Sequence, residues 1–330
     1  MPEIGKTDMS NIKPLILGVA LDAGAITYGP AEGWRDRWST LFATLDGVAE
    51  FATIEDGFAR TSGDGPDATL LANWLAPRAP RIGLIADAAL NFAEPFHVST
   101  AIATLDYVSE GRAGLLAQRL RGERVSEAIA AIGALDGFPR ADDEALDQDG
   151  TDAIEVIRRL WDSWEDDAVI RDPETQRYLD GGKLHYVDFR SDSFKILGPS
   201  ITPRPPQGQP VVAAHWAKGT DSSLALAADL VIVRVEDIAA FRALPGATGK
   251  LVIAEIDDTD NLFAAARAAV VAGAGALRIA LSGSLEQAAR FASDIAPSLR
   301  AAGLVRPSAE GPLRQRFGLP ATPNRYATAA

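Results

Sequence analysis

The chain has 330 residues, of which 47% are hydrophobic and 23% are charged, a composition typical of a globular protein. Its 45 acidic and 32 basic residues give a formal net charge of −13, which argues against partners such as nucleic acid or an anionic membrane. The absence of cysteine excludes disulfides and thiolate chemistry, and three histidines make a three-histidine metal centre improbable, so we expect no metal site. The first 13 residues lack the apolar segment of a signal peptide and no apolar run is long enough to cross a membrane, so we expect a cytoplasmic protein.

Short apolar runs, typical of buried strands, alternate along the chain with alanine-rich helical patterns. The predicted strands are 14–20, 50–55, 81–86, 113–118, 210–214, 229–235, 250–256 and 276–281. The predicted helices are 33–48, 66–78, 97–108, 123–135, 151–166, 219–228, 236–243, 259–272 and 284–301. Because each parallel strand pair needs a crossover connection, this alternation predicts a parallel sheet. Eight such units in one chain predict an α/β protein with a closed (β/α)8 TIM barrel, forming a single domain over residues 1–330.

The segment between the fourth and fifth strands is too long for a simple crossover. We interpret DDEALDQDGTD (142–152) as an acidic linker, followed by a helix and then by an excursion of turns and short strands that ends near residue 209. A loop of this length in a compact domain is usually functional or part of an interface. By contrast, the sixth, seventh and eighth strands follow one another closely, which predicts a shortened C-terminal half.

Barrel enzymes build their active sites where the strands end at the carboxyl side, so the polar residues there are the first candidates. The predicted register places the following residues at this rim: Asp22, Glu55, Asp56, Asp87, Gln118, His215, Trp216, Arg234, Glu255 and Ser282. The alternative is that the acidic members are solvated or paired with Arg119, Lys218 and Arg234. Adjacent strand residues point to opposite sides, so Glu55 and Asp56 cannot together form the carboxylate pair of a glycoside hydrolase.

The turn after the fifth strand, His215-Trp216-Ala217-Lys218-Gly219-Thr220, carries the strongest candidates. His215 could move a proton, and Trp216 could stack on a planar ring. Lys218 and Thr220 precede a predicted helix, whose N-terminus is favourable for an anion, although ordinary capping explains them equally well. Ser282-Gly283-Ser284 offers a weaker anion site, and His97 and His185 are more simply explained by packing.

Three blocks of the sequence resemble the bacterial luciferase-like, flavin-dependent monooxygenases, in the branch of the nitrilotriacetate and dibenzothiophene-sulfone monooxygenases. The first block is EPFHVSTAIATLDYVSEGRAG (94–114) and the second runs from IRRLWDSWEDD to PPQGQPVV (157–212). The third is RAAGLVRPSAEGPLRQRFGLPATPNRYA (300–327). The fold of that family is a (β/α)8 barrel, in agreement with the strand pattern.

The resemblance implies a monooxygenase that uses O2 and reduced FMN, supplied by a separate NAD(P)H-dependent flavin reductase, to oxidise a small organic substrate. F420 is a less favoured cofactor, and the family implies a homodimer. The resemblance places the flavin at the strand ends that here carry Asp56, Asp87, Gln118, Trp216, Lys218 and Thr220, with His215 as the catalytic candidate. The family's Thr/Ser-rich stretch after the third strand is replaced here by Asp87-Ala88-Ala89, and its asparagine after the fourth strand is absent. The alternative is therefore a paralogue with weakened or lost flavin binding that acts as a binding or partner subunit.

Overall fold

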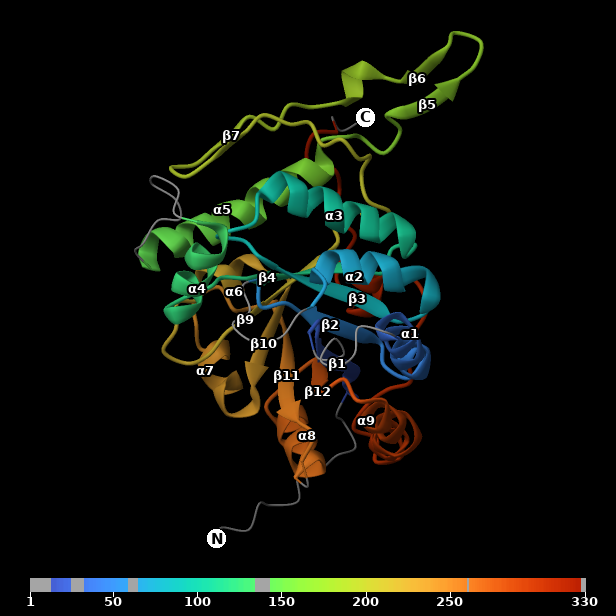
Figure 1. The fold of residues 1–330 in the computed structure, drawn as a ribbon, viewed down its shortest axis with the longest axis vertical. Coiled ribbons are helices and arrows are strands. Elements are labelled where there is room, and N and C mark those ends of the chain that lie inside the picture. The colour runs from blue at the N-terminus through green and yellow to red at the C-terminus, as the bar shows by residue number, and fades with distance from the viewer. Residues whose placement is uncertain (1–12, 25–32, 59–64, 134–142, 260, 328–330) are drawn as a thin grey trace.

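A closed barrel of eight parallel strands forms the centre of the computed structural model, which describes residues 13–24, 33–58, 65–133, 143–259 and 261–327 (Figure 1). The strands are β1 (Ile16–Asp22), β2 (Phe51–Glu55), β3 (Gly83–Ala89), β4 (Ala113–Gln118), β9 (Val211–His215), β10 (Leu230–Arg234), β11 (Leu251–Asp257) and β12 (Ala276–Ala280). They follow one another around the barrel in chain order, and β12 pairs with β1 to close it. The predicted barrel is confirmed, with strand boundaries that differ from the prediction by a few residues.

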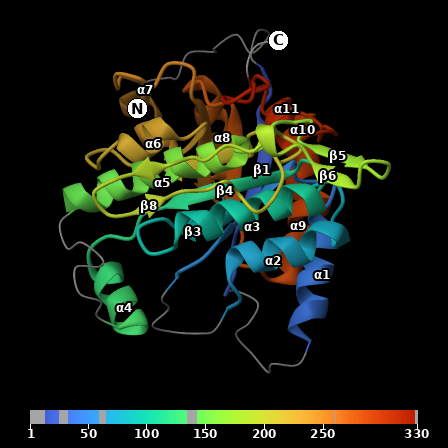
Figure 2. The ribbon, with the colours of Figure 1, turned by 90° about the horizontal axis from the view of Figure 1, so that it is seen from above.

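Helices surround the barrel and cover the outer face of its strands, as the view from above shows (Figure 2). Those that follow the strands or lie between them are α1 (Trp34–Leu45), α2 (Ala68–Leu75), α3 (Pro95–Val108), α4 (Glu123–Ile132), α5 (Asp143–Asp162), α6 (Ser223–Ala227), α7 (Ile238–Arg242) and α8 (Leu262–Val271). After β12 come α9 (Leu285–Arg290), the π-helical turn η5 (Phe291–Ile295), α10 (Ala296–Ala301) and α11 (Leu313–Arg316). Short 3-10 turns are η2 (Ala76–Arg78), η3 (Gly181–Lys183) and η4 (Val235–Asp237). The helices α6 and α7 have only five residues each, which agrees with the predicted shortening of the C-terminal half.

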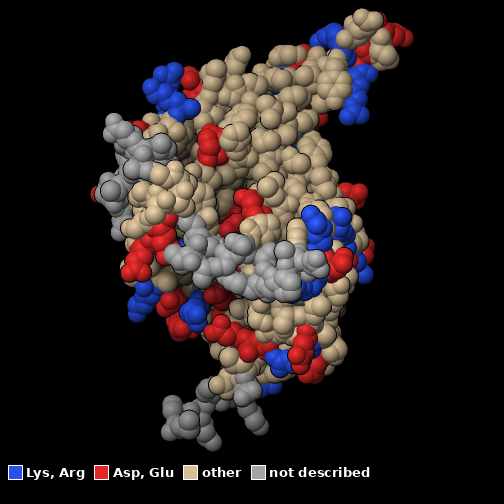
Figure 3. Space-filling view, in the orientation of Figure 1, with Lys and Arg blue, Asp and Glu red and all other residues tan. Residues whose placement is uncertain are grey.

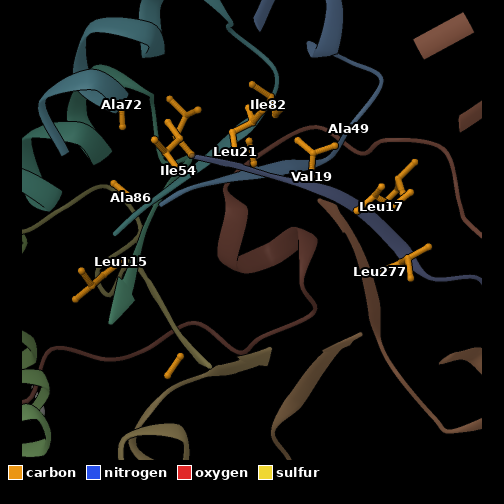
Figure 4. Packing of buried hydrophobic residues seen from close by; sticks show 14 of the residues in the cluster. Leu17, Val19, Leu21, Ala49, Ile54, Ala72, Ile82, Ala86, Leu115 and Leu277 are labelled. Atoms are coloured by element: carbon orange, nitrogen blue, oxygen red, sulfur yellow. The ribbon is translucent and has the colours of Figure 1, made fainter. Parts of the chain in front are cut away.

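Strand alternation divides the core into two apolar layers. Leu17, Val19 and Leu21 of β1 belong to the larger layer, which fills the space between strands and helices (Figure 4). Ile16 belongs to the inner layer, which fills the barrel together with Phe51, Ile85 and residues of the other strands. The inner layer is apolar near the amino ends of the strands. The polar residues that also point to the inside of the barrel therefore lie nearer the carboxyl ends.

The amino end of the barrel is closed by the C-terminal segment. Phe317, just after α11, lies with its ring centroid 5.2 Å from that of Phe51, and Leu313 packs into the same inner layer. Two glycines make room for this packing: a Cβ at Gly18 would meet the ring of Phe51 at 2.3 Å, and one at Gly83 would meet Leu313 at 2.5 Å. These side chains fill the inner layer at this end of the barrel, and a pocket of about 460 Å³ lies beside them, lined by Ile16, Leu251 and Phe317 among others.

The acidic segment predicted as a linker is helical, and this expectation was wrong. The helix α5 begins at Asp143, so residues 143–152 form its first turns rather than a connection to it. Leu146 is buried against Leu120, and Asp147 forms ion pairs with Arg119 and Arg121. Tertiary burial and ion pairing thus stabilise as a helix a segment whose many acidic residues had suggested a linker.

The predicted excursion between the barrel strands β4 and β9 contains two small antiparallel hairpins. The first joins β5 (Val169–Asp172) to β6 (Arg177–Leu179), and the second joins β7 (Phe189–Arg190) to β8 (Lys195–Ile196). Figure 1 shows β5 and β6 projecting away from the barrel, above α3 and α5. In the part of the chain that the structure describes, no helix is both long and apolar enough to cross a membrane.

Candidate active site at the carboxyl end of the barrel

The carboxyl ends of β2, β4, β9, β10 and β11 surround a pocket of about 450 Å³, which we call the mouth pocket. Its lining residues are Glu55, Ala117, Gln118, Arg119, Arg121, Arg124, His215, Trp216, Ala217, Thr220, Asp221, Leu224, Ile232, Val233, Arg234 and Glu255. The strand register brings these ends level, with Arg234 beside Glu255 on the neighbouring strand. The mouth pocket therefore occupies the position at which barrel enzymes place their chemistry.

A buried arginine lies between two glutamates of the mouth pocket. Arg278 points inward from β12 and its side chain is 2% exposed. Its Nη1 lies 2.5 Å from Oε1 of Glu55 and donates to Thr53 Oγ1 at 2.8 Å, while its Nη2 forms an ion pair with Glu255. A buried guanidinium is costly unless carboxylates compensate it, and here two of them do. Glu55 and Glu255 share this one guanidinium, so Arg278 compensates only part of their charge.

His215 contacts this cluster from β9 and faces the mouth pocket. Its Nε2 lies 3.6 Å from Glu55 Oε1, and its side chain is 42% exposed. Desolvation raises the pKa of Glu55, but the contact with His215 and the charge of Arg278 outweigh it and bring that pKa to about 2. Desolvation lowers the pKa of His215, and Glu55 opposes this effect while Arg278 adds to it. Glu55 is consequently ionised at neutral pH, and His215 is neutral and able to accept a proton.

Arginine side chains from the loop after β4 line one side of the mouth pocket. Arg119 pairs with Asp147 at 2.8 Å and approaches Asp221 at 3.5 Å, and Arg121 also pairs with Asp147. Arg124, at the start of α4, is exposed and donates to Gln118 Oε1 at 3.3 Å. Across the pocket, Arg234 lies 3.8 Å from Asp257. Four arginines and three acidic residues line the mouth pocket, so its lining carries an excess of positive charge.

Trp216 provides a wall of the mouth pocket rather than an exposed ring. It is 6% exposed and its ring centroid lies 5.4 Å from that of Phe241. Its indole Nε1 is buried and has no hydrogen-bond acceptor among the described residues. A buried donor without an acceptor is costly and is usually satisfied by water or by a ligand. This N–H and Arg119 Nε are the buried donors without a partner among the described lining residues of the mouth pocket.

A second, smaller pocket of about 300 Å³ lies on the other side of β2, and we call it the acidic pocket. Its lining residues are Asp56, Phe58, Asp67, Thr69, Leu70, Asp87, Ala88, Ala89, Ala93, Glu94, His97, Val98 and Ala101. Asp87 is 2% exposed and accepts the backbone N–H of Asp56 through Oδ2 at 2.9 Å. Burial raises the pKa of Asp87 well above its usual range, and the charges of Glu55 and Asp56 raise it further.

The structure divides the residues that the sequence singled out. His215, Trp216, Gln118 and Thr220 line the mouth pocket, whereas Asp56 and Asp87 line the acidic pocket. As predicted, Glu55 and Asp56 face opposite sides of β2.

Other candidates take part in local structure. Lys218 is exposed and lines neither pocket; its backbone N–H donates to Asp237 Oδ2 at 3.1 Å. The Thr220 hydroxyl donates to the Ala217 carbonyl at 2.8 Å within the turn. Ser284 caps α9, and Ser282 donates to Gln287 at 2.8 Å, so both serines of the predicted anion turn have partners within the chain.

The remaining two histidines lie away from the mouth pocket. His97 is exposed near the start of α3 and lines the acidic pocket. His185 pairs with Glu165 at 2.8 Å and stacks on Tyr326 with ring centroids 5.2 Å apart, which agrees with a packing role.

Sequence reasoning missed Arg121, Arg124 and Arg278 as site residues and considered Arg119 only as a partner for acids. Arg278 stands at an inward position of its strand, two residues from the inner-layer Ala276. A lone charge at an inward strand position was the available signal, because such a charge must be paired inside the barrel.

Comparison with known proteins agrees with the fold. The model of the luciferase-like monooxygenase family matches residues 44–244, more than half of the chain. The chain belongs to this family.

Two relatives carry the same family resemblance. The chain is 34% identical to N-acetyl-S-(2-succino)cysteine monooxygenase of Bacillus subtilis over 47% of this chain and 34% of the relative. It is 32% identical to nitrilotriacetate monooxygenase component A of Aminobacter aminovorans over 48% of this chain and 33% of the relative. The matched part thus spans about a third of each of these luciferase-like relatives.

A solved structure of riboflavin lyase with modified FMN and riboflavin superposes with a TM-score of 0.77. That superposition covers 94% of this chain and 97% of that one at 16% sequence identity, so it shows a common fold.

Proposed function

We propose that the chain is a flavin-dependent monooxygenase that oxidises a small organic substrate with O2, using reduced FMN delivered by a separate NAD(P)H-dependent flavin reductase. Family membership supports the reaction class, and relatives named as monooxygenases support it further. The observation that carries the proposal is the mouth pocket, which combines an excess of arginine with a buried, unpaired indole N–H. As in the family, we expect the protein to act in the cytoplasm as a homodimer.

The donor set of the mouth pocket fits a phosphorylated flavin. Arg124 offers an exposed guanidinium for a phosphate, and the backbone carbonyl of Gly57 and the amide of Gln118 orient it. Ala117, Ile232 and Val233 form an apolar wall suited to a flat ring, and Trp216 adds its unpaired N–H as a donor for a ring oxygen or nitrogen. A volume of about 450 Å³ lies within the range of cofactor pockets.

When bound, reduced FMN would supply the electrons for the reaction with O2. The imidazole of His215 would accept or donate a proton in the pocket, because desolvation and Arg278 lower its pKa and keep it neutral. Glu55 would hold that imidazole in place, itself fixed by Arg278 at 2.5 Å. Trp216 and Leu224 would exclude water from one wall of the pocket.

A second candidate function follows from the cluster around Arg278. Arg278 forms ion pairs with both Glu55 and Glu255 at the centre of the mouth without any ligand. This arrangement favours a family member with weakened or lost flavin binding that acts as a binding or partner subunit.

Anaerobic titration distinguishes the two functions. Reduced FMN, oxidised FMN and F420 are each added to the purified protein, and binding is followed by flavin absorbance and fluorescence. The monooxygenase proposal expects saturable binding of reduced FMN, stronger than that of F420. If none of the three binds, the partner-subunit function is supported instead.

A further inference from the structure

The pocket of about 460 Å³ at the amino end of the barrel combines cationic side chains with apolar walls, and we call it the amino-end pocket. It lies between the starts of β1, β11 and β12 on one side and the C-terminal segment around α11 on the other. The two sides are joined by the backbone, since the N–H of Arg306 donates to the carbonyl of Leu15 at 2.9 Å. Its volume lies within the range of pockets that bind small molecules.

Arg316 is the feature of this pocket that the fold leaves incomplete. It is 8% exposed, and its Nε and Nη1 donate to the carbonyls of Gly311 and Arg81 at 2.7 and 2.6 Å. Among the described residues, its Nη2 has no acceptor and its charge has no ion-pair partner. A buried guanidinium is costly unless an anion compensates it. Because Arg316 lines the amino-end pocket, an anion bound there would supply what the chain does not.

A second buried arginine shows that such a donor need not stay free. Arg112 is 6% exposed and forms no ion pair among the described residues either. Its two Nη atoms, however, donate to the carbonyls of Ala76, Ala79 and Ile82, which enclose the guanidinium. Backbone carbonyls can therefore complete a buried arginine in this fold, and Arg316 differs because one side of it adjoins a pocket.

The charge balance of the amino-end pocket favours an anion. Lys13, Arg306 and Arg316 line it, whereas Glu310 is the one acidic residue in its described lining. Glu310 is exposed and pairs with an arginine outside the pocket at 3.5 Å, and Arg306 pairs with the buried Glu50 at 3.1 Å. Lys13 and Arg316 therefore remain as cations without an ion-pair partner among the described residues.

This excess of positive charge is local. Acidic side chains are widespread on the face shown in Figure 3, in keeping with the formal net charge of −13. The charge of the whole chain thus repels anions, and only a site with its own cations can hold one. The amino-end pocket meets that condition.

Apolar side chains favour an organic anion over an inorganic one. Ile16 and Phe317 are buried and Leu251 is half-buried, and all three line the pocket. The ring of Phe317 is fixed by its contact with Phe51, with ring centroids 5.2 Å apart. A short hydrocarbon body would cover this wall, whereas a phosphate ion would leave it in contact with water.

We propose that the amino-end pocket binds small monocarboxylates with a short apolar body. The carboxylate is directed toward Arg316, whose planar guanidinium matches its geometry, and the hydrocarbon lies against Ile16, Leu251 and Phe317. This site is at the opposite end of the barrel from the flavin site proposed for the mouth pocket and does not depend on it.

Isothermal titration with hexanoate, 1-hexanol, n-hexylammonium and inorganic phosphate tests the proposal. We expect hexanoate to bind at least about tenfold more tightly than 1-hexanol, because only the carboxylate forms charge-assisted hydrogen bonds. Phosphate should bind more weakly than hexanoate, and n-hexylammonium should not bind. Equal affinity for hexanoate and 1-hexanol would overturn the proposal, and so would phosphate binding as tight as that of hexanoate.

Variants assign the binding to this pocket. Arg316→Gln should weaken hexanoate binding by about tenfold or more, because it removes both the charge and the planar donor pair. Lys13→Gln should weaken it by about threefold, since Lys13 is exposed and its charge is screened by solvent. Lys13→Gln remains a valid test if Arg316→Gln does not fold. Unchanged hexanoate affinity in either folded variant would overturn the proposal.

The matched control comes from the other arginine-lined pocket. Arg124→Gln removes one positive charge from the mouth pocket and should leave hexanoate binding unchanged. A loss in Arg124→Gln equal to that in Arg316→Gln or Lys13→Gln would place hexanoate in the mouth pocket and overturn the proposal.

The same preparations separate this proposal from the proposed function. Hexanoate binding without FMN binding would remove the flavin proposal and leave this one standing. FMN binding without hexanoate binding would do the reverse.

Discussion

The mouth pocket and the acidic pocket share one strand and differ in charge. Glu55 and Asp56 are consecutive, yet Glu55 lies inside the barrel beside Arg278 and Asp56 faces the acidic pocket. The mouth pocket has four arginines in its lining, whereas the acidic pocket has none among the described residues. In the mouth pocket the pKa of Glu55 is accordingly lowered to about 2, whereas the pKa of Asp87 in the acidic pocket is raised.

This difference shows that the guanidinium groups, rather than the number of carboxylates, set the charge balance of each pocket. Both pockets are rich in acidic side chains at the ends of neighbouring strands. Where the chain supplies Arg119, Arg124 and Arg278, an anionic ligand becomes favourable. The acidic pocket has no arginine in its lining among the described residues, and there the pKa of Asp87 is raised. Each of the predictions below changes one of these charges.

Removal of Arg278 should have the largest effect. Arg278→Met keeps most of the side-chain volume but leaves Glu55 and Glu255 without their shared cation, so we expect a loss of about 3 kcal/mol in the free energy of unfolding. Both glutamates are partly exposed, which keeps the loss at the lower end for a broken buried ion pair. Urea denaturation at neutral pH measures it.

A triple variant provides the control for this loss. Combining Arg278→Met with Glu55→Gln and Glu255→Gln removes the uncompensated charges and should recover most of the stability. If Arg278→Met is as stable as the parent, solvent rather than Arg278 compensates the charges of the two glutamates. The contrast between the two pockets would then have no electrostatic basis.

A smaller effect is expected at the rim of the mouth pocket. Under the proposed function, Arg124→Gln should weaken binding of reduced FMN about tenfold, the scale of one charge-assisted hydrogen bond. Lys218→Gln is the matched control, because it removes the same charge from an exposed residue that lines neither pocket. Anaerobic flavin titration compares them, and an equal loss in both variants would indicate a general charge effect instead of a phosphate contact.

Much of this fold could be predicted because its signals are local. Apolar strands alternate with helical patterns, and that alternation requires parallel strands and leads to a barrel. Strand alternation also predicted correctly that Glu55 and Asp56 diverge. The start of α5 could not be predicted in the same way, because Asp147 and its neighbours are stabilised by Arg119 and Arg121 from a different part of the chain.

The site was harder to predict for the same physical reason. The rim position of His215 follows from where its strand ends, and the structure places it in the mouth pocket. The pairing of Arg278 with two glutamates from other strands depends on the closure of the barrel, which brings β12 next to β11 and β1. Lys218 differs from His215 in this respect. Its place near a helix start was predicted, but the sequence did not determine the direction of its side chain.

The pH dependence of stability should distinguish the acidic pocket. Between the ordinary pKa of an aspartate and the raised pKa of Asp87, the unfolded chain is ionised at this residue while the folded chain holds a proton. Stability must therefore fall as the pH rises through this interval, by up to about 1.4 kcal/mol per pH unit for this one group. Glu55 acts in the opposite sense, and its contribution is lost only as the pH falls toward about 2.

Asp87→Asn should remove this fall and leave the variant more stable than the parent on the alkaline side of the interval. Asp106, whose pKa burial raises to about 6, acts in the same sense as Asp87 but is present in both proteins, so the difference between the two curves isolates Asp87. Urea denaturation between about pH 4 and pH 8 measures both curves. Parallel curves would show that Asp87 titrates alike in the folded and unfolded chains, and that its burial has no electrostatic cost.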